Sequence, residues 1–316
     1  MESRAVVENF ISNCKGVDKT QAKQLILNKE IWKYEEEFNN DVVHYTEANI
    51  ANIFVEKLKI YKPNTFNAII DIYKKFYQYC VKSQYIDKNP FHMSTDLNYE
   101  YLIRYAIDNG NVEYYEKDFV MERCNQETYN IPYYKAIAFS LFEGIHDFKE
   151  LVIDMKDVDF YHNIIRLRER NFVFSDELRG YYQEVQGMKQ FEGEKRPYDL
   201  EEGLLVRRIV GSRKGISYPK TDDRYYAQIA QTYSKRMQHI GLSQDVIYDS
   251  GVIHFFLHRV GKDKMFDLLL SEKDKGDITA SNKELAVLLK EYGIKSSPKK
   301  FRFCYKPYMI MLKYQD

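Results

Sequence analysis

Residues 63–82 constrain the fold of this chain more than any other stretch, because apolar side chains recur there at helical spacing. These side chains are Phe66, Ile69, Ile70, Tyr73, Phe76, Tyr77 and Cys80. Pro63 and Asn64 interrupt the chain at the start of the stretch, so Thr65 is the predicted N-cap. Pro90 disfavours a helical conformation at the residue before it and ends the segment. The pattern predicts an amphipathic helix that buries one face against further helices.

The rest of the first third also favours helices. Residues 21–38 hold neither Gly nor Pro, and residues 45–58 contain Thr46 as a predicted N-cap ahead of four apolar residues at helical spacing. Periodicity weakens after residue 91, and a domain boundary is expected there. The predicted ranges are a helical domain at 1–95, a linker at 96–112 and a second domain at 113–316.

The composition is that of a globular protein. Apolar residues make up 44% of the 316 and charged residues 30%. The longest uncharged apolar runs, such as "AIAFSLF", fall far short of the roughly 20 residues that cross a bilayer. The N-terminus lacks the apolar core of a secretory signal, and the four cysteines form no CxxC pair. We therefore expect a cytoplasmic protein with reduced thiols, no membrane contact, no metal and no cofactor.

Charge is balanced overall but unevenly placed. Lysine plus arginine and aspartate plus glutamate both number 47. Residues 30–60 carry seven acids and three lysines, whereas residues 205–264 carry eleven bases and five acids. A neutral chain of this kind can present a basic surface to a polyanion, although ordinary solvated helix faces explain the same pattern.

Several segments, in their order along the chain, resemble tyrosine recombinases, the phage integrase family. The helix described above ends in "YIDKNPF", "YNIPYYKAIAFSLFEGIHDFKELVIDMKDVDF" resembles the first helices of the catalytic domain, and "NIIRLRERNFVFSDEL" resembles its small sheet. "LSQDVIYDSGVIHFFLHRVG" takes the place of the family's histidine–x–x–arginine helix. The resemblance covers roughly residues 30–290. It implies a mainly α fold with a small antiparallel β-sheet, made of a helical core-binding domain and an α+β catalytic-like domain.

The residues that the family's chemistry needs are replaced. The first catalytic arginine falls on His146, or on Asp147 if the alignment starts from Glu150. The family's histidine aligns with Asp245 and its second arginine with Tyr248. Neither His146 nor Asp147 supplies the planar, permanently charged fork with which arginine holds a phosphate. The resemblance therefore implies a recombinase scaffold without catalysis, and no enzymatic activity is expected.

A tyrosine nucleophile is also not identified by the sequence. The C-terminal candidates are Tyr292, Tyr305, Tyr308 and Tyr314. The glycine–histidine pair expected before the nucleophile is missing, and the predicted sheet offers arginines but no lysine to protonate a leaving group. With 28 tyrosines in the chain, a tyrosine near the C-terminus is weak evidence of reactivity.

Three functions remain open. The first is a sequence-specific repressor of a temperate phage that maintains lysogeny by binding operator sites in double-stranded DNA. The second is an active but divergent recombinase that recruits arginines from elsewhere. The third is a phage protein that binds a partner protein and no DNA. The repressor reading allows a regulatory phage protein as a further partner, and the oligomeric state is open.

The candidate DNA-binding residues are basic or polar side chains placed where such a scaffold would face DNA. Those in the first domain are Lys62, Asn64, Thr65, Asn67, Lys74, Lys75 and Lys82. Those in the second are Arg166, Arg168, Arg170, Arg207, Arg208, Arg213, Lys214, Lys220, Arg259, Lys262 and Lys264. Arg166, Arg168 and Arg170 alternate and are expected to share one face of a strand. His254 and His258 have the spacing of paired zinc ligands, but no third ligand is evident, so ordinary helix packing is favoured.

Overall fold

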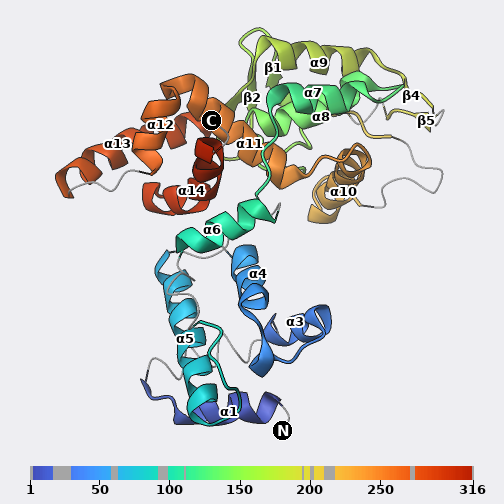
Figure 1. Ribbon diagram of the computed structural model, residues 1–316. Helices are drawn as coiled ribbons and strands as arrows, with labels where there is room; N and C mark the ends of the chain where they lie inside the picture. Colours follow the sequence, from blue (N-terminus) through green and yellow to red (C-terminus); the bar gives the residue numbers. More distant parts are fainter. Residues whose placement is uncertain are drawn as a thin grey trace. The chain divides into compact units, whose positions relative to one another are not determined.

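The computed structural model is mainly helical, with two small antiparallel sheets, as the sequence predicts (Figure 1). It describes residues 3–16, 30–57, 63–91, 99–109, 112–193, 196–199, 203–209, 218–270 and 275–314. The chain divides into two compact units: Met1–Glu113 together with Ser296–Asp316, and Tyr114–Lys295. The C-terminal segment therefore groups with the N-terminal unit, whereas the predicted second domain runs to residue 316.

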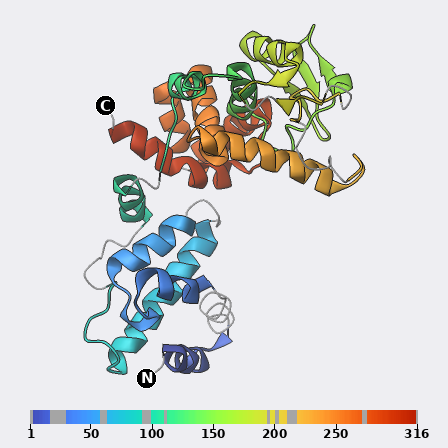
Figure 2. The same cartoon turned by 90° about the vertical axis from the view of Figure 1, so that its right-hand side faces the viewer.

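The first unit is built from helices. They are α1 (Ser3–Asn13), α3 (Glu30–Phe38), the 3₁₀ turn η1 (Val42–His44), α4 (Glu47–Lys57), α5 (Pro63–Lys82), α6 (Tyr99–Asp108) and α14 (Pro298–Tyr314). The blue and cyan helices of Figure 2 belong to this bundle. Phe10 of α1 meets Phe76 of α5 edge to face at 5.4 Å, and the buried Tyr77 hydroxyl donates to the carbonyl of Val42 at 2.7 Å. The predicted apolar stripe of α5 thus forms part of a helical core.

Two helix starts test the predicted caps. At α4 the prediction is confirmed, because the Thr46 hydroxyl accepts from the Asn49 backbone N–H at 3.2 Å while Asn49 Oδ1 accepts from the Thr46 N–H at 2.9 Å. At α5 the prediction that Thr65 is the N-cap is wrong, because the helix already begins at Pro63 and Thr65 lies within its first turn. Proline fits the first helical position, where its missing N–H would have no intrahelical partner.

The predicted linker at residues 96–112 contains a helix, α6. Its periodicity is easy to miss, because only Leu102 and Ala106 among its described side chains are buried. Helix α6 packs on α4 and α14 within the first unit.

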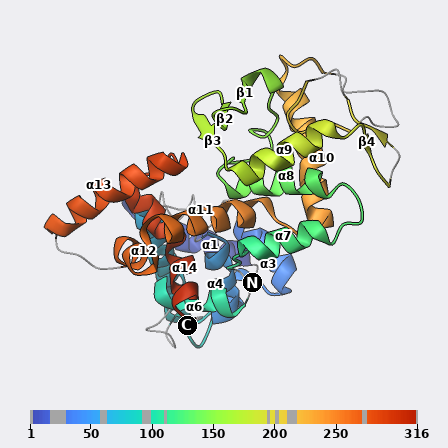
Figure 3. The same ribbon diagram turned by 90° about the horizontal axis from the view of Figure 1, so that it is seen from above.

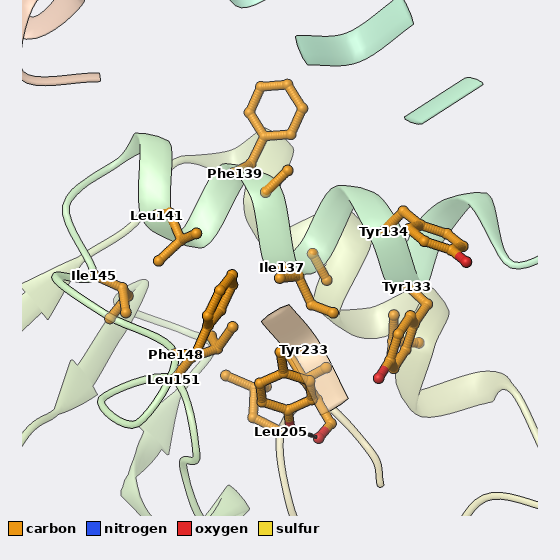
Figure 4. Packing of buried hydrophobic residues seen from close by; sticks show 14 of the residues in the cluster. Tyr133, Tyr134, Ile137, Phe139, Leu141, Ile145, Phe148, Leu151, Leu205 and Tyr233 are labelled. Atoms are coloured by element: carbon orange, nitrogen blue, oxygen red, sulfur yellow. Dashed lines mark hydrogen bonds between the residues drawn. The ribbon is translucent and has the colours of Figure 1, made fainter. Parts of the chain in front are cut away.

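The second unit surrounds one buried helix. Its helices are α7 (Lys117–Asn125), α8 (Ile131–Phe142), η2 (Met155–Asp157), α9 (Asp176–Gly187), α10 (Asp223–His239), α11 (Gln244–Val260), α12 (Lys262–Leu269) and α13 (Lys275–Tyr292). Nine of the twelve residues of α8 are buried, and α8 packs on α7, α9, α10 and α11. Figure 3 shows α9 alongside α8, and Figure 4 shows Tyr133, Ile137 and Tyr233 within the shared core.

The sheet of the second unit is a meander of short strands. Strands β1 (Val158–Asp159), β2 (Ile164–Arg166) and β3 (Asn171–Val173) pair in that order, with Ile165 opposite Phe172 on the buried face. A smaller sheet pairs β4 (Gln190–Phe191) with β5 (Arg196–Pro197). The small antiparallel sheet that the resemblance implies for this region is confirmed.

The prediction that Arg166, Arg168 and Arg170 alternate on one strand face is wrong. Only Arg166 lies in β2, whereas Arg168 and Arg170 belong to the turn before β3. The Leu167 N–H donates to the carbonyl of Arg170 at 2.9 Å and closes that turn. The alternation of basic and other residues therefore marks a tight hairpin and not a longer strand.

Helix α11 crosses α8 at very close range. A Cβ added to Gly251 would lie 1.9 Å from the carbonyl oxygen of Phe142, so only glycine fits there. Among the described residues, no helix is long and apolar enough to cross a membrane, and no group of three or more metal-ligating side chains is found. All four cysteines are free thiols.

Candidate functional site

Two adjoining hollows lie between α10, the turn at residues 144–151 and the start of α11. Their volumes are about 450 and 700 Å³, and both are lined by Phe148, Ser234 and Gln244. The smaller hollow is also lined by Tyr115, Gln238, Gly241, Leu242, Ser243 and Asp245. The larger is also lined by Asp147, Lys149, Tyr218, Ala227, Gln228, Ala230 and Gln231. We call these connected hollows the α10 groove.

Helix α10 forms one wall of the groove and has two faces of opposite character. Tyr225, Ile229, Tyr233 and Met237 recur at every fourth position and are buried, and the Tyr233 hydroxyl donates to the carbonyl of Val206 at 2.7 Å. The exposed side chains of α10 include Gln228, Gln231, Lys235 and Gln238, which share a second face by helical spacing. No acid occurs between Arg224 and His239. This helix therefore presents amides and a cation to solvent.

The turn at residues 144–151 forms the opposite wall and is held by its own hydrogen bonds. Asp147 Oδ1 accepts from the backbone N–H groups of Lys149 and Glu150 at 2.8 Å each. Glu150 Oε2 accepts from the His146 N–H at 2.6 Å. The Phe148 N–H donates to Gln244 Oε1 at 3.3 Å and so links the turn to the first residue of α11.

Arg170 from the β2–β3 turn reaches this same segment. Its Nη2 donates to the carbonyl oxygen of Gly144 at 2.6 Å and to Glu150 Oε2 at 3.0 Å. Only 17% of the Arg170 side chain is exposed. The guanidinium is thus engaged within the protein.

The positions where the sequence lacks the family's catalytic residues lie around the same turn. His146 is exposed and its ring lies 3.6 Å from the Asp147 carboxylate, which raises the pKa of His146 and lowers that of Asp147 to about 2. Asp245 is exposed in the α10 groove. Tyr248 packs against His146, and burial raises the pKa of its hydroxyl to about 12. A neutral tyrosine, two carboxylates and an exposed imidazole do not reproduce a phosphate clamp.

The C-terminal tyrosines whose side chains are described are buried. Tyr292 donates its hydroxyl to the carbonyl of Phe142 at 2.9 Å, and burial raises its pKa well above the ordinary value. Tyr305 and Tyr308 lie on α14 and are 8% and 1% exposed. The side chain of Tyr314 lies outside the described residues. In this state Tyr292 is a packing residue and not an accessible nucleophile.

Many of the predicted DNA-binding bases of the second unit have partners inside it. Arg208 pairs with Asp199, Lys220 with Asp154, Arg259 with Glu291, and Lys264 with Glu284. Arg207 donates to the carbonyl of Met188, and Lys262 lies over the Phe266 ring. Arg166 and Arg168 are exposed, and no partner is found for either within the described part of the chain. Arg213 and Lys214 lie outside the described residues.

The predicted residues of the first unit lie on or before α5. Lys62 is outside the described residues, and Asn64, Thr65 and Asn67 occupy the first turns of α5 with side chains that are not described. Lys74 is half-buried, whereas Lys75 and Lys82 are exposed. These residues belong to the first unit, and the α10 groove belongs to the second.

The α10 face was missed by the sequence reasoning, although a signal existed. Gln228, Gln231, Lys235 and Gln238 recur at helical spacing in an acid-free segment. The segments richest in bases instead contain Arg207, Arg208 and Arg259, which pair or bond within the unit.

Comparison with known proteins gives a faint likeness in fold. No protein-family model and no curated protein match the chain. The XerA recombinase crystal structure is similar at a TM-score of 0.37 and 13% identity, over 99% of this chain and 98% of that one. A Tn1549 transposon integrase with a circular intermediate DNA is similar at 0.33 and 11% identity, over 99% of both chains. The same integrase with transposon right-end DNA gives 0.31 and 12% identity, over 97% and 99%. A likeness this distant assigns no residue a role, so function has to be argued from the side chains of this chain.

Proposed function

We propose that this protein binds double-stranded DNA through the α10 groove and represses transcription without cutting the DNA. The exposed face of α10, which is rich in amides and free of acids, carries the proposal. The lysine on this face has no carboxylate partner within the described residues, so it is available to an external anion. A polyanion is the partner that this charge pattern fits best.

The chemistry of the α10 face also suits base reading. An α-helix fits the major groove, where glutamine can bond an adenine edge through its N6 and N7 atoms. Gln228 and Gln231 are exposed and spaced i,i+3, and Lys235 follows one turn later on the same face. Glutamines for base edges and lysine for phosphates are the two kinds of contact that specific DNA binding needs.

The non-catalytic part of the proposal has separate support. Strand transfer by a tyrosine requires an accessible hydroxyl and cations that hold the scissile phosphate. Tyr292 is buried with its hydroxyl on the carbonyl of Phe142, and Arg170 is bound to Glu150. These contacts favour a binding protein over an active divergent recombinase.

The narrower role rests on the sequence resemblance described above. We propose that the protein resembles the master repressor of lysogeny of SPbeta-type Bacillus phages and acts on operator sites. A regulatory phage protein would be an additional partner. No cofactor is required for this role.

The proposal is tested by a gel mobility shift on fragments of the source phage genome near physiological salt, with a parallel lane quenched in detergent. We expect discrete shifts on a few fragments that vanish in detergent. An adduct that survives detergent would mean that a tyrosine attacks phosphate, and the non-catalytic assignment would be wrong. No shift on any fragment would favour a partner-binding protein instead.

The α10 assignment needs its own control. Lys235→Gln removes the cation on the proposed reading face, whereas Lys290→Gln removes a lysine that is also exposed, on α13. We expect the first change to weaken the shift and to reduce its salt dependence, because one fewer counterion is released. The second change should leave both unchanged. Equal effects of the two changes would mean that α10 is not the contact.

A further inference from the structure

The Glu150 carboxylate lies at the centre of a closed set of contacts beside the α10 groove. Its Oε2 accepts from the Arg170 guanidinium at 3.0 Å and from the backbone N–H of His146 at 2.6 Å. Arg170 also donates to the carbonyl of Gly144 at 2.6 Å. Charge-assisted bonds of this kind hold geometry better than neutral ones. They tie residues 144, 146 and 150 of one turn to the β2–β3 hairpin.

The position of Arg170 is restricted from the other side as well. A Cβ on Gly293 would lie 2.3 Å from Arg170 Nη1, and Gly293 has a positive φ of +88°. The positive φ favours glycine there, and the Gly293 backbone lies close to the guanidinium. Arg170 braces the turn through its bonds with Glu150 and Gly144.

The braced turn presents Phe148 and Lys149 to the groove. Both residues line the larger hollow, opposite Gln228 and Gln231 of α10. Lys149 is exposed, and within the described residues its ammonium has no carboxylate partner. Of the two acids nearest in sequence, Glu150 is bonded to Arg170 and to the backbone N–H of His146, and Asp147 accepts from backbone N–H groups of the turn and lies beside His146.

We propose that Lys149 contacts a DNA phosphate from the wall opposite α10, and that Glu150 and Arg170 are positioning residues that hold it there. This inference rests on the proposed DNA binding. Under this inference both walls of the α10 groove contact DNA. The amides of α10 contact base edges, and the lysine of the turn contacts the DNA phosphate backbone. Glu150 and Arg170 themselves do not touch DNA.

Whether DNA affinity rises or falls when Glu150 is removed distinguishes a positioning role from plain repulsion between its carboxylate and the phosphates. Removing a carboxylate near DNA ordinarily raises affinity, because repulsion of the phosphates falls. If Glu150 positions Lys149, its removal lowers affinity instead. Asp245→Asn is the matched control, since Asp245 is an exposed acid that lines the same groove.

The experiment measures DNA affinity against salt concentration for the full-length protein, using fluorescence anisotropy on a shifted fragment. We expect Lys149→Gln to weaken binding about fivefold and to lower the salt slope by about 0.9. Glu150→Ala should weaken binding about threefold and Asp245→Asn should strengthen it. Glu150→Gln should keep affinity within about twofold of wild type, because its amide oxygen can still accept from Arg170 and His146.

A double-variant cycle completes the test. Once Lys149 is glutamine, Glu150→Ala should no longer weaken binding, since the residue that it positions is gone. An increase in affinity for Glu150→Ala, or an undiminished effect in the Lys149→Gln background, would overturn the inference. If Glu150→Ala does not fold, Arg170→Lys takes its place, because lysine is less able to hold both Gly144 and Glu150. Hydrogen exchange at the His146 amide reports whether the turn has loosened.

Failure of this inference can be told from failure of the proposed function. If wild type binds DNA and Lys235→Gln weakens binding, the proposed function stands even when Lys149→Gln has no effect. In that case the turn at residues 144–151 lines the groove but does not contact DNA. If wild type binds no DNA fragment, both proposals are wrong.

Discussion

Two basic regions of the second unit differ in how their charges are used. Around residues 207–220 and on α11 and α12, several cations are paired with carboxylates of the same unit, as in Arg259–Glu291 and Lys264–Glu284. On α10, Lys235 is exposed beside glutamines, with no acid between Arg224 and His239. A paired lysine has to give up its carboxylate before it can bind phosphate, whereas an unpaired one does not. Under the proposed function, the density of basic residues in a sequence is therefore a poor guide to the DNA-binding face, and bases without acid partners are the better candidates for phosphate contacts.

The largest expected effect separates these two regions directly. The double change Gln231→Ala and Lys235→Gln removes one base-edge contact and one phosphate contact. We expect it to cost about 2 kcal/mol of binding free energy, roughly 30-fold in affinity. Arg259→Gln should change affinity less than threefold, because Glu291 already neutralises that guanidinium. Anisotropy titrations at one salt concentration measure both variants, and a larger loss for Arg259→Gln would reverse the comparison.

The β2–β3 hairpin tests whether unpaired bases outside α10 also contact DNA. Arg166 and Arg168 are exposed without a partner in the described residues, and Arg170 two positions on is enclosed by Glu150 and Gly144. We expect Arg166→Gln with Arg168→Gln to cost about 1 kcal/mol, roughly fivefold in affinity. The salt slope should fall by about 1.8 if both arginines contact phosphates. An unchanged slope would restrict the contact region to the α10 groove.

From the sequence, the local elements can be predicted better than whether each charged side chain is paired within the protein or exposed to a ligand. The capping pattern at Thr46 and Asn49 lies within four residues and can be recognised directly. Arg170 looks like Arg166 and Arg168 in the sequence, and only its contact with Glu150, twenty positions away, shows that it is structural. The groove depends on Phe148 and Gln244 meeting across ninety-six positions, which no local pattern encodes. Pairing between distant segments therefore decided which predicted site residues remain exposed and unpaired.

Tyr292 differs from both basic regions because its hydroxyl and the Phe142 carbonyl to which it donates are both buried. Replacing it with phenylalanine removes the hydroxyl that donates to the carbonyl of Phe142 and leaves the ring packing against Phe255. We expect the free energy of unfolding to fall by about 1 kcal/mol, because the Phe142 carbonyl loses a buried partner. DNA affinity should not change. Urea denaturation and anisotropy measure the two quantities, and a loss of DNA binding at unchanged stability would mean that the hydroxyl faces DNA at some stage.

His254 tests the packed side of α11 through pH. Its ring lies 5.1 Å from Phe142, and burial together with His258 and Lys117 lowers its pKa to about 4. The charges that act on His254 are Lys117 of α7, which is itself paired with Glu177 of α9, and His258 one turn later on α11. In the unfolded chain a histidine protonates near pH 6.5. The unfolded state therefore binds more protons between about pH 4 and 6.5, and His254 lowers stability as pH falls through that window.

The change His254→Phe removes this titration while keeping an aromatic ring against Phe142. We expect the melting temperature of the variant to fall less than that of wild type between pH 6.5 and 4.5, by a few degrees, as judged by thermal melts at several pH values. Parallel curves for the two proteins would mean that the imidazole is protonated in the folded state and faces water. The α11 surface beside Phe142 would then belong with the solvent-facing polar groups, as the α10 face does, and would itself become a candidate for binding an anion.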